Sequence, residues 1–576
     1  MSKLIFFSVL MFIVTNLNAA DKYKLEDFSL NLNSSLTPPN HLWVSSGWST
    51  VNPLSTTVMG VGDCIGAPLA GKDFKLFVTL EANGHQIKDV GSTGKGDVGL
   101  LFQGGQWQPD KIIRKGTYNY LIDNNIISLG VQSELIPLYN RTGFIIKCSI
   151  RNRLGTTLRI KVSPEITPGN PNYIPLNSWT YSQPGAGESA TSNGEGIWSN
   201  NKVKIALFTE SPTFDIPANQ SHTSYIAVTF TEQSSISVPP QKLRDWELEE
   251  RLAWENRLNR ALREVPVIKS SISGLDDYYK RSIVSGLVSI WENPAFVVNP
   301  FLATSGIDGG ATCTYLWDFG GYIPRMACLI LGDKVLPCTK AMANIGLDKS
   351  YAYTLDGTGI GVPYAYSTWS FVNLVWEISK HMGINEALFN EARRLVLLNE
   401  KLESPNNLID YGVQHNLLEM RSAGWEHYVA SPNAERAWCL ERLAEMGEKI
   451  SYDPIEIKQW REKSLIIKKA IQSQLWDPVS HWFKCIYPTG HTELVYSIQA
   501  FDALRAEACT KEMEKGLLEH LKDGRFLFSY GVSSVSAEDS VHYEVNDTDW
   551  SGGGAYTGDG PDLALILYGQ GKSGIA

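Results

Sequence analysis

The feature that most constrains this chain is a change of hydrophobic period near residue 240. From about residue 27 to residue 237, short runs rich in Val, Ile, Phe and Thr alternate with turn clusters such as Asn-Gly and Pro-Gly. Regular short strands with turn punctuation predict an antiparallel β-sandwich of roughly 200 residues. From Leu275 onward, apolar residues recur at the spacing of helices instead. In a chain of 576 residues we therefore expect two or more domains.

A charged helical segment separates the two patterns. Trp254, Leu258 and Leu262 recur there among many charges, and Pro266 follows them. This spacing predicts a linker helix over residues 239–266, packed along both domains. A coiled-coil partner helix is the alternative, but the pattern lasts for fewer than four heptads.

The rest of the chain is expected to be helix after helix. Short loops alternate there with long loops rich in Gly, Trp, Tyr and Asp, an alternation typical of an (α/α)6 toroid whose long loops gather at one end. We therefore expect a multidomain β + α protein with an N-terminal antiparallel β-sandwich (21–238), the linker helix and a C-terminal (α/α)6 toroid (267–576). Six helical hairpins need twelve helices, whereas the pattern supports ten, so the toroid is expected to be incomplete. The ten helices are expected near residues 275–291, 314–331, 334–345, 367–382, 385–402, 432–448, 454–476, 494–505, 510–522 and 558–569.

The first 20 residues have the pattern of a secretory signal peptide. Lys3 is followed by an apolar run over residues 4–14 and then by the small residues Ala19 and Ala20. No second apolar run is long enough to suggest a membrane span. We therefore expect a secreted or periplasmic protein that is soluble once the signal peptide is removed.

The charge balance excludes some classes of partner. The chain has 51 basic and 61 acidic residues, a formal charge of −10, which argues against nucleic acid or an anionic membrane as a general partner. Its 8 cysteines are scattered without the CxxC or CxxH spacing of zinc sites. We expect neither a metal nor a cofactor, and the sequence predicts no oligomeric state.

The first candidate for chemistry is Glu426. It stands between Trp425 and His427, shortly before a helix-start signal at Ser431 and Pro432. A glutamate held against a tryptophan loses solvation, which raises the pKa of its carboxyl group and lets it keep a proton near neutral pH. Such a group can act as a general acid. The alternative is a surface glutamate in a loop.

The second candidate is the pair Trp317 and Asp318, with Tyr322 shortly after it. An aspartate beside a tryptophan can bind two sugar hydroxyls while the indole ring stacks on the pyranose ring. The alternative is that Asp318 caps a helix start and Trp317 packs in the core. The Gly- and Tyr-rich residues 351–366 are expected to face the substrate or to form a plain turn.

The third candidate is an acidic, glycine-rich stretch further along the chain. It holds the carboxylates of Glu544, Asp547 and Asp549, followed by Trp550, three glycines and Tyr556. Glycines let a backbone approach a ligand closely. The alternative is a solvated acidic loop.

These three stretches resemble motifs of six-hairpin (α/α)6 toroid glycoside hydrolases. The Gly-Trp-Glu run at 424–426 is similar to the Gly-Trp-Asp or Gly-Leu-Asp signature of family 37 trehalases and family 63 glucosidases, with Glu in place of Asp. The Tyr-Leu-Trp-Asp run at 315–318 resembles the Tyr-Trp-Asp signature of family 37. The Trp-Ser-Gly-Gly-Gly run at 550–554 resembles the Trp-Arg-Gly-Pro stretch of family 63.

The resemblance implies an exo-acting glycoside hydrolase that cleaves oligosaccharides without a cofactor. In these families the carboxylate at the position of Glu426 is the catalytic acid, the usual mechanism inverts the anomeric configuration, and the base lies beyond the stretch matched by 550–556. Because the sequence stops soon after that stretch, Glu544, Asp547 or Asp549 would have to supply the base. The residues expected to bind substrate are Trp317, Asp318, Tyr322, Trp425, His427, Trp550 and Tyr556.

Two other classes of function stay open. A polysaccharide lyase can also combine an α-toroid with β-sheet, but it would use Tyr or His as the base and would need positive charge to bind the uronate. A non-catalytic glycan-binding protein would keep the aromatic residues without needing paired carboxylates.

Overall fold

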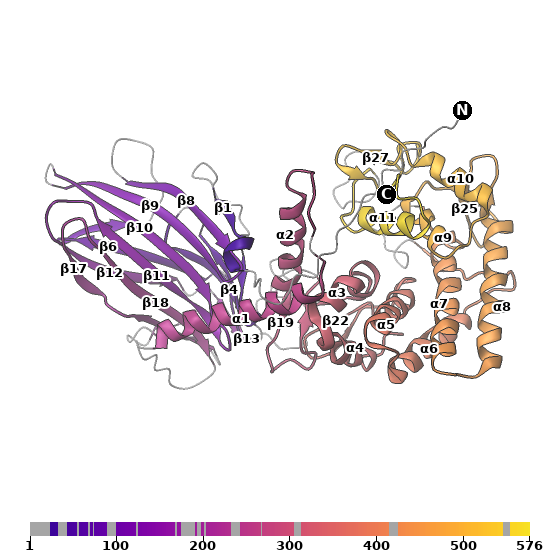
Figure 1. Ribbon diagram of the computed structural model, residues 1–576, viewed down its shortest axis with the longest axis horizontal. Coiled ribbons are helices and arrows are strands. Elements are labelled where there is room, and N and C mark those ends of the chain that lie inside the picture. The colour runs from indigo at the N-terminus through magenta and orange to yellow at the C-terminus, as the bar shows by residue number, and fades with distance from the viewer. Residues whose placement is uncertain are drawn as a thin grey trace, which may run out of the picture. The chain divides into compact units, whose positions relative to one another are not determined.

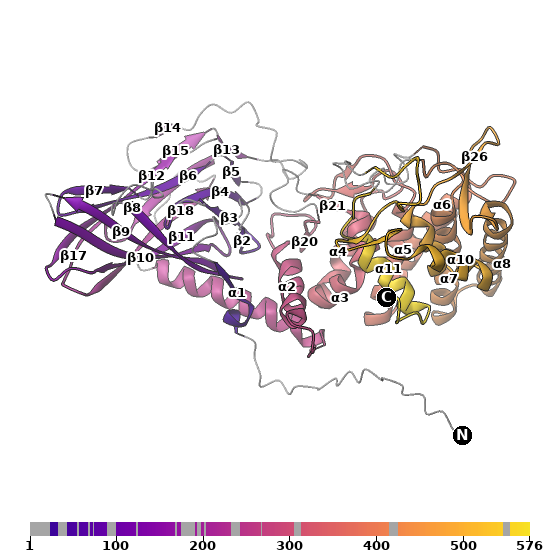
Figure 2. The ribbon, with the colours of Figure 1, turned by 90° about the horizontal axis from the view of Figure 1, so that it is seen from above.

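The computed structural model describes residues 24–32, 43–54, 57–66, 69–72, 74–88, 99–122, 125–167, 170–173, 191–192, 197–200, 203–231, 242–266, 268–304, 313–413, 424–544 and 553–576. The predicted signal peptide lies outside these residues. They form two compact units. The β unit comprises the described residues up to Ala295, and the helical unit comprises those from Phe296 onward, apart from Leu329–Gly332. Figures 1 and 2 show the strands of the β unit in indigo to purple and the helices of the helical unit in rose to yellow.

Two antiparallel sheets make up most of the β unit. The first has the strand order β1-β8-β9-β10-β11-β18-β16-β15-β14, and the second has the order β13-β5-β4-β6-β12-β17, with β3 beside β4, β2 beside β3 and β7 beside β6. The strands of the first sheet are β1 (Leu30–Leu32), β8 (Gly99–Gln108), β9 (Lys111–Ile122), β10 (Asn125–Pro137), β11 (Thr142–Asn152), β14 (Thr191–Ser192), β15 (Ile197–Asn200), β16 (Val203–Thr209) and β18 (Ser221–Thr231). Those of the second are β2 (Val44–Ser45), β3 (Thr50–Pro53), β4 (Val61–Gly66), β5 (Leu69–Lys72), β6 (Lys75–Ala82), β7 (His85–Lys88), β12 (Leu158–Thr167), β13 (Asn170–Tyr173) and β17 (Thr213–Ile216).

Buried aromatic side chains of the two sheets meet around Phe74. This residue immediately precedes β6, and its ring lies edge-on to Phe144 of β11 and Phe230 of β18, with centroid distances of 5.9 and 5.6 Å. All three rings are buried. The antiparallel sheets predicted from the sequence are confirmed, and their layout as a sandwich stays a prediction.

Helix α1 (Lys242–Glu264) covers most of the predicted linker helix and packs on the β unit. Its Leu243 and Trp246 belong to a buried apolar cluster with residues of β10, β11 and β18. Further along the helix, the indole N–H of Trp254 donates a hydrogen bond of 2.9 Å to the backbone carbonyl of Ser45. The next helix, α2 (Leu275–Val288), and the short strand β19 (Ile290–Trp291) also belong to this unit.

The helical unit holds the remaining elements. Its helices are α3 (Pro324–Leu331), α4 (Val335–Ala343), α5 (Ser367–Met382), α6 (Glu386–Glu400), α7 (Ala430–Lys449), α8 (Pro454–Ala470), α9 (Asp502–Arg505), α10 (Lys511–His520) and α11 (Asp559–Gly569), with shorter turns η2 (Trp317–Tyr322), η3 (Gly332–Lys334), η5 (Ile471–Leu475) and η6 (Ile498–Phe501). Short strands lie in its loops: β20 (Phe301–Leu302), β21 (Thr314–Tyr315), β22 (Ala352–Tyr353), β23 (Gly359–Ile360), β24 (Trp476–Asp477), β25 (Trp482–Ile486), β26 (Thr492–Leu494), β27 (Leu527–Phe528) and β28 (Gly531–Val532).

In the part of the chain that the structure describes, each helical segment predicted from Leu275 onward contains a helix. The main departure is at 314–331, where a π-helical turn, η2, precedes α3. Pro324 begins α3, because proline suits the first turn of a helix. A Cβ on Gly320 would lie 2.1 Å from the carbonyl oxygen of Ser370, so α5 packs directly against this turn. The incomplete toroid stays a prediction.

Helices α5 and α7 are buried on nearly all sides. A helix without a solvent face lies inside its unit, and α7 packs against α5, α6, α8 and α9. The first turns of α5 and α7 therefore lie in the interior of the helical unit. Within the described residues, no helix combines the length and the apolar character that a membrane crossing needs.

Candidate active site in the helical unit

The starts of three helical segments meet around the hydroxyl of Tyr366. Tyr366 immediately precedes α5, Ser431 lies in the first turn of α7, and Gln499 lies in η6, which leads into α9. The Tyr366 hydroxyl is 2.9 Å from Oγ of Ser431 and 2.6 Å from Oε1 of Gln499. Burial, and then the negative charges of Asp502 and Glu435, raise the pKa of Tyr366 well above its usual value. The hydroxyl therefore stays protonated and remains a donor at neutral pH.

Trp425 is tied to the same hydrogen-bond network. Its side chain is 1% exposed, and its indole N–H donates to Oγ of Ser431 at 3.0 Å. The ring is thus packed in the interior, while Glu426 and His427 next to it are only partly buried. Trp425 therefore fixes the place of Glu426 at the entry to α7.

His427 has an unusual backbone conformation, with a φ of 61°. Positive φ is uncommon for a residue with a Cβ, and such conformations persist where surrounding contacts hold them. Nδ1 of His427 lies 2.9 Å from Oδ1 of Asp410, which also accepts a hydrogen bond of 2.8 Å from the Gly412 N–H. The backbone N–H of His427 donates to the Gly412 carbonyl at 2.7 Å, and that of Tyr411 donates to the His427 carbonyl at 3.2 Å. These contacts hold the strained residue in place.

A second group of polar side chains lies near Glu426. The Tyr487 hydroxyl donates to Oε2 of Glu493 at 3.0 Å, and Oε1 of Glu493 lies 3.4 Å from Nε2 of His542. Nδ1 of His542 lies 3.0 Å from Oδ1 of Asp539. Burial raises the pKa of the Tyr487 hydroxyl, and the hydrogen bond to Glu493 and the negative charge of Glu426 add to this effect. Tyr487 therefore acts as a donor, and not as a base, beside the two carboxylates.

The sequence analysis did not single out Asp410, Glu493 or Tyr487. Glu493 lies on β26, which pairs with β25, and Ile486 of β25 also pairs with Tyr428. The hairpin thus brings Glu493 beside the segment of Glu426. A contact made through such tertiary pairing leaves no local motif that a sequence pattern could reveal.

The predicted sugar-binding residues Asp318, Tyr322 and Tyr556 come together, although they lie far apart in the sequence. The Tyr556 hydroxyl donates to Oδ1 of Asp318 at 3.4 Å. The rings of Tyr556 and Tyr322 have centroids 5.9 Å apart, and the Tyr322 hydroxyl donates to Oδ1 of Asp559 at 3.0 Å. Asp559 begins α11, so this cluster also lies at the start of a helix.

Trp317 belongs to an array of nearly parallel aromatic rings. Its ring centroid lies 5.0 Å from that of Tyr315 and 5.3 Å from that of Tyr364, and Tyr364 in turn stacks on Tyr351 at 4.8 Å. The side chain of Trp317 is 8% exposed, so most of its surface packs against protein. Its indole N–H is buried and finds no hydrogen-bond partner among the described residues.

Three predicted site residues, Asp547, Asp549 and Trp550, lie outside the described residues. Glu544 is described and exposed, and its carbonyl accepts a hydrogen bond of 3.0 Å from the Gly553 N–H. The roles of Glu426 as acid and of Glu544 or Asp549 as base stay predictions.

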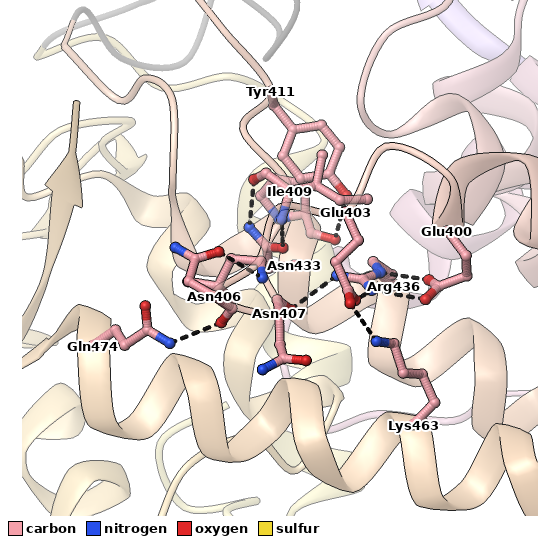
Figure 3. A network of polar contacts seen from close by, with 12 residues as sticks. Glu400, Glu403, Asn406, Asn407, Ile409, Tyr411, Asn433, Arg436, Lys463 and Gln474 are labelled. Atoms are coloured by element: carbon pink, nitrogen blue, oxygen red, sulfur yellow. Dashed lines mark hydrogen bonds and ion pairs between the residues drawn. The ribbon is translucent and has the colours of Figure 1, made fainter. Parts of the chain in front are cut away.

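A buried ionic network supports the loop that carries Asp410 (Figure 3). The guanidinium of Arg436, on α7, has a side-chain exposure of 1% and binds the carboxylates of Glu400 and Glu403. It also donates to the carbonyl of Asn407 at 3.1 Å. Nζ of Lys463 lies 2.5 Å from Oε1 of Glu403. The charges in this network are thereby paired, as buried charges must be.

Asn433, one turn earlier on α7, completes the support. Its Oδ1 accepts a hydrogen bond of 2.9 Å from the Ile409 N–H, and its Nδ2 donates to the Ile409 carbonyl at 3.1 Å. Figure 3 shows these contacts next to those of Arg436. The residue that precedes Asp410 is thus fixed to an inner helix through both of its backbone polar groups.

A cavity of about 300 Å³ lies beside α5, the middle of α7, and α11. The side chains that line it include Tyr322, Asn373, Trp376, Trp438, Arg442 and Asp562. Tyr322 therefore takes part both in this cavity and in the cluster with Tyr556. In the described parts of the chain, no group of three or more His, Cys, Asp and Glu residues is placed to hold a metal ion.

Comparison with known proteins gives a likeness in fold. No family model and no curated relative match the sequence. A bacterial glucoamylase, solved in complex with acarbose, matches with a TM-score of 0.51 and 10% identity, over 85% of this chain and 78% of that one. A GH78 family rhamnosidase of Bacillus sp. GL1 matches with a TM-score of 0.41 and 12% identity, over 77% of this chain and 41% of that one. A neutral trehalase of Saccharomyces cerevisiae matches with a TM-score of 0.35 and 14% identity, over 46% of this chain and 63% of that one.

The likeness to the glucoamylase bears on architecture. At 10% identity it concerns the fold alone. It confirms that the chain resembles six-hairpin toroid glycoside hydrolases in the way that its strands and helices are combined.

Proposed function

We propose that this protein is an exported, exo-acting glycoside hydrolase that cleaves oligosaccharides with inversion of configuration. The proposal rests on where residues predicted from separate motifs lie. The Tyr556 hydroxyl donates a hydrogen bond of 3.4 Å to Asp318. Glu426 lies shortly before the start of α7. A rigid scaffold that presents loop residues in this way is typical of active sites. The fold likeness to a glucoamylase supports the same proposal.

The proposed architecture has four parts. A signal peptide over residues 1–20 precedes a β-sandwich over 21–238, a linker helix over 239–266 and an (α/α)6 toroid over 267–576. Mass spectrometry of the exported protein tests the first part, because cleavage after Ala19 or Ala20 would remove a defined mass.

In the proposed reaction, Glu426 gives its proton to the glycosidic oxygen as the bond to the anomeric carbon breaks. A second carboxylate, from Glu544, Asp547 or Asp549, removes a proton from the water that attacks the opposite face of the anomeric carbon. The two carboxyl groups of an inverting glycosidase stand about 6.5–9.5 Å apart to leave room for that water. Glu426 gives up one proton and the second carboxylate takes up one, so the reaction changes no net charge or oxidation state and needs no cofactor.

The terminal sugar is proposed to bind between Asp318 and the aromatic side chains around it. Asp318 accepts hydrogen bonds from sugar hydroxyls, and the indole N–H of Trp317 donates one. Tyr322 and Tyr556 supply ring edges and hydroxyl groups. Trp550, His427 and Trp425 are proposed to contribute to substrate binding as well.

The test is a screen of aryl glycosides and oligosaccharides, with NMR of the first anomer released. Acarbose is the first inhibitor to try, since the glucoamylase was solved with it. Release of a reducing sugar with inverted configuration would support the proposal. A product that absorbs in the ultraviolet because of an unsaturated uronate would replace it by a lyase. Tight saccharide binding without turnover would replace it by a glycan-binding protein.

A further inference from the structure

A rigid stack of aromatic rings stands on the surface of the helical unit, in the turn between β27 and β28. The ring of Phe528 stacks on that of Tyr530 with a centroid distance of 5.1 Å and an interplanar angle of 3°. The ring of Tyr543 continues the stack at 6.4 Å and 27° from Phe528. Tyr530 is 56% exposed, so one end of the stack is open to solvent.

The exposed ring of Tyr530 is held in place. Its hydroxyl donates to the carbonyl of Gly553 at 3.0 Å, and Phe528 supports its ring. Phe528 pairs with Gly531 across the hairpin, and a Cβ built on Gly531 would meet no atom within 4 Å. The space beside Gly531 is therefore open, and the neighbouring Tyr530 is itself 56% exposed. A large aromatic group that is rigid before binding loses little conformational entropy when a ligand stacks on it.

The stack is connected to the proposed sugar pocket through residues 553–556. The Gly553 N–H donates to the carbonyl of Glu544, one of the proposed bases, at 3.0 Å. A Cβ on Gly553 would lie 2.9 Å from Cζ of Tyr543, so glycine lets the stack approach this segment. Tyr556 follows three residues later and bonds Asp318. Three residues span at most about 11 Å, so the stack lies close to the pocket of the terminal sugar.

The chemistry of the stack suits a neutral, flat ligand with polar edges. Partial burial, and then a hydrogen bond with Tyr543, raise the pKa of Tyr530 to about 12. The phenol is therefore neutral at physiological pH. A pyranose ring offers the same combination, because its C–H groups form an apolar face and its hydroxyls project from the rim.

We propose that Tyr530, supported by Phe528 and Tyr543, is the stacking surface of an additional subsite, which binds one pyranose ring of an oligosaccharide beyond the two rings that the cleaved bond joins. This inference rests on the proposed glycosidase function and specifies its substrate as longer than a disaccharide. One ring is expected to stack, because among the three described rings of the stack Tyr530 is the exposed one, whereas Phe528 and Tyr543 are partly buried.

The experiment measures binding of short and long saccharides to the Glu426→Gln protein by calorimetry. The probes are maltose and maltopentaose, cellobiose and cellopentaose, and mannobiose and mannopentaose. Adding Tyr530→Ala should weaken the binding of the preferred pentasaccharide about tenfold, the loss expected for one aromatic stack. Binding of the corresponding disaccharide should change less than twofold. Tyr530→Phe keeps the ring but loses the hydrogen bond to Gly553, so it should bind the pentasaccharide more tightly than Tyr530→Ala does.

Tyr568→Ala is the matched control. Tyr568 is 57% exposed and lies on α11, so its removal changes the surface by the same amount at another place. The subsite is overturned if Tyr530→Ala weakens the binding of the disaccharide as much as that of the pentasaccharide. It is also overturned if Tyr568→Ala weakens pentasaccharide binding as much as Tyr530→Ala does. A change of oligomeric state on Tyr530→Ala in analytical ultracentrifugation overturns it too, and would assign the ring to a contact between copies. If the parent protein binds saccharides but Tyr530→Ala is without effect, the subsite fails and the glycosidase proposal stands. If the parent protein binds none of the six, the subsite for these chains fails, and the hydrolysis screen decides the proposed function separately.

Discussion

Oδ1 of Asp410 lies 2.9 Å from Nδ1 of His427, and the two residues come from two different loop segments of the helical unit. Oδ1 of Asp410 accepts a second hydrogen bond, from the Gly412 N–H, so the carboxylate has a fixed orientation. A carboxylate beside Nδ1 favours a proton on Nδ1. It thereby determines whether Nε2 of the neutral ring is a donor or an acceptor. The pair thus sets the orientation of His427 next to the proposed acid, Glu426.

We therefore expect Asp410→Asn to lower kcat/KM about tenfold or more with little change in melting temperature. The reason is that a hydrogen bond to a charged group in a site contributes about 1.5–3 kcal/mol. Steady-state kinetics and thermal denaturation of the same preparation provide the two measurements. The pH profile of kcat/KM should also change shape, which a purely structural role of Asp410 would not cause.

Glu519→Gln is the control for this change. His481 also has a positive φ, of 52°, and its Nδ1 lies 3.3 Å from Oε2 of Glu519, but about half of each side chain is exposed. His481 precedes β25, whereas Ile486 at the end of β25 pairs with Tyr428. Loss of activity in Glu519→Gln equal to that in Asp410→Asn would contradict a specific role for the Asp410–His427 pair.

The variant Glu426→Gln should lose hydrolysis of natural oligosaccharides by a factor of about 10²–10⁴, the usual contribution of general acid catalysis. Aryl glycosides with good leaving groups should be affected much less, because their departure needs no proton. The measurement is kcat of the variant and of the wild type on each of the two substrate classes. Glu448→Gln, which alters a half-exposed glutamate paired with Arg461, should leave both rates unchanged. Near-normal turnover of an oligosaccharide by Glu426→Gln would exclude the assignment.

Much of the helical unit could be predicted from local patterns. The bounds of α5 were predicted correctly, since its apolar residues recur without a break and Gly383, with a φ of 80°, follows its last turn. The break between η2 and α3 was missed, because the close packing of Gly320 on Ser370 is a tertiary contact. A sequence pattern carries no information on such a contact.

The site was predicted in part, and for the same reason. Trp317, Asp318 and Tyr322 share one short motif, so a local pattern could identify them. Asp410 and Glu493 reach the site through the hydrogen bonds of distant loops. Their neighbours in sequence form no motif, and only the folded chain identifies them.

The bond between Tyr556 and Asp318 leads to a third prediction. Asp318→Ala should lose most of the activity, because the sugar hydroxyls lose their hydrogen-bond acceptor. Its melting temperature should fall by at most a few degrees, because the substitution opens no cavity in the core. Tyr556→Phe removes only the donor to Asp318 and should raise KM more than it lowers kcat. A large fall in melting temperature in Asp318→Ala, with full activity of the folded fraction, would favour a helix-capping role for Asp318.

Arg436→Met should destabilise the helical unit by about 1.5–3 kcal/mol, because the largely buried carboxylate of Glu400 loses its charged hydrogen-bond partner, whereas Glu403 keeps Lys463. The side chain of Arg436 is 1% exposed, and it binds two carboxylates. Arg394 of α6 is the matched control, since it also binds two carboxylates but is 45% exposed. Arg394→Met should therefore cost less than about 1 kcal/mol. Urea denaturation of both variants at pH 7 checks the difference, and equal costs would contradict the role of burial.

The same network predicts how stability depends on pH. Burial opposes the ionisation of Glu403, but hydrogen bonds from Lys463 and Arg436 outweigh it and hold the pKa of Glu403 below its usual value of 4.5. The folded protein thus binds this proton more weakly than the unfolded chain does. The contribution of Glu403 to stability is therefore complete above pH 4.5 and is lost as the pH falls through the lower pKa of the folded state.

Glu403→Gln should accordingly be less stable than the wild type at pH 7, and the difference should shrink steadily as the pH is lowered from 4.5 towards 3. Melting temperatures measured across this range at constant ionic strength provide the test. Glu462→Gln, which changes an exposed glutamate 3.7 Å from Lys458, should follow the wild-type curve throughout. A difference between Glu403→Gln and the wild type that stays constant from pH 7 to pH 3 would mean that Glu403 stabilises the loop by packing, because a contribution from its charge must disappear once both states are protonated.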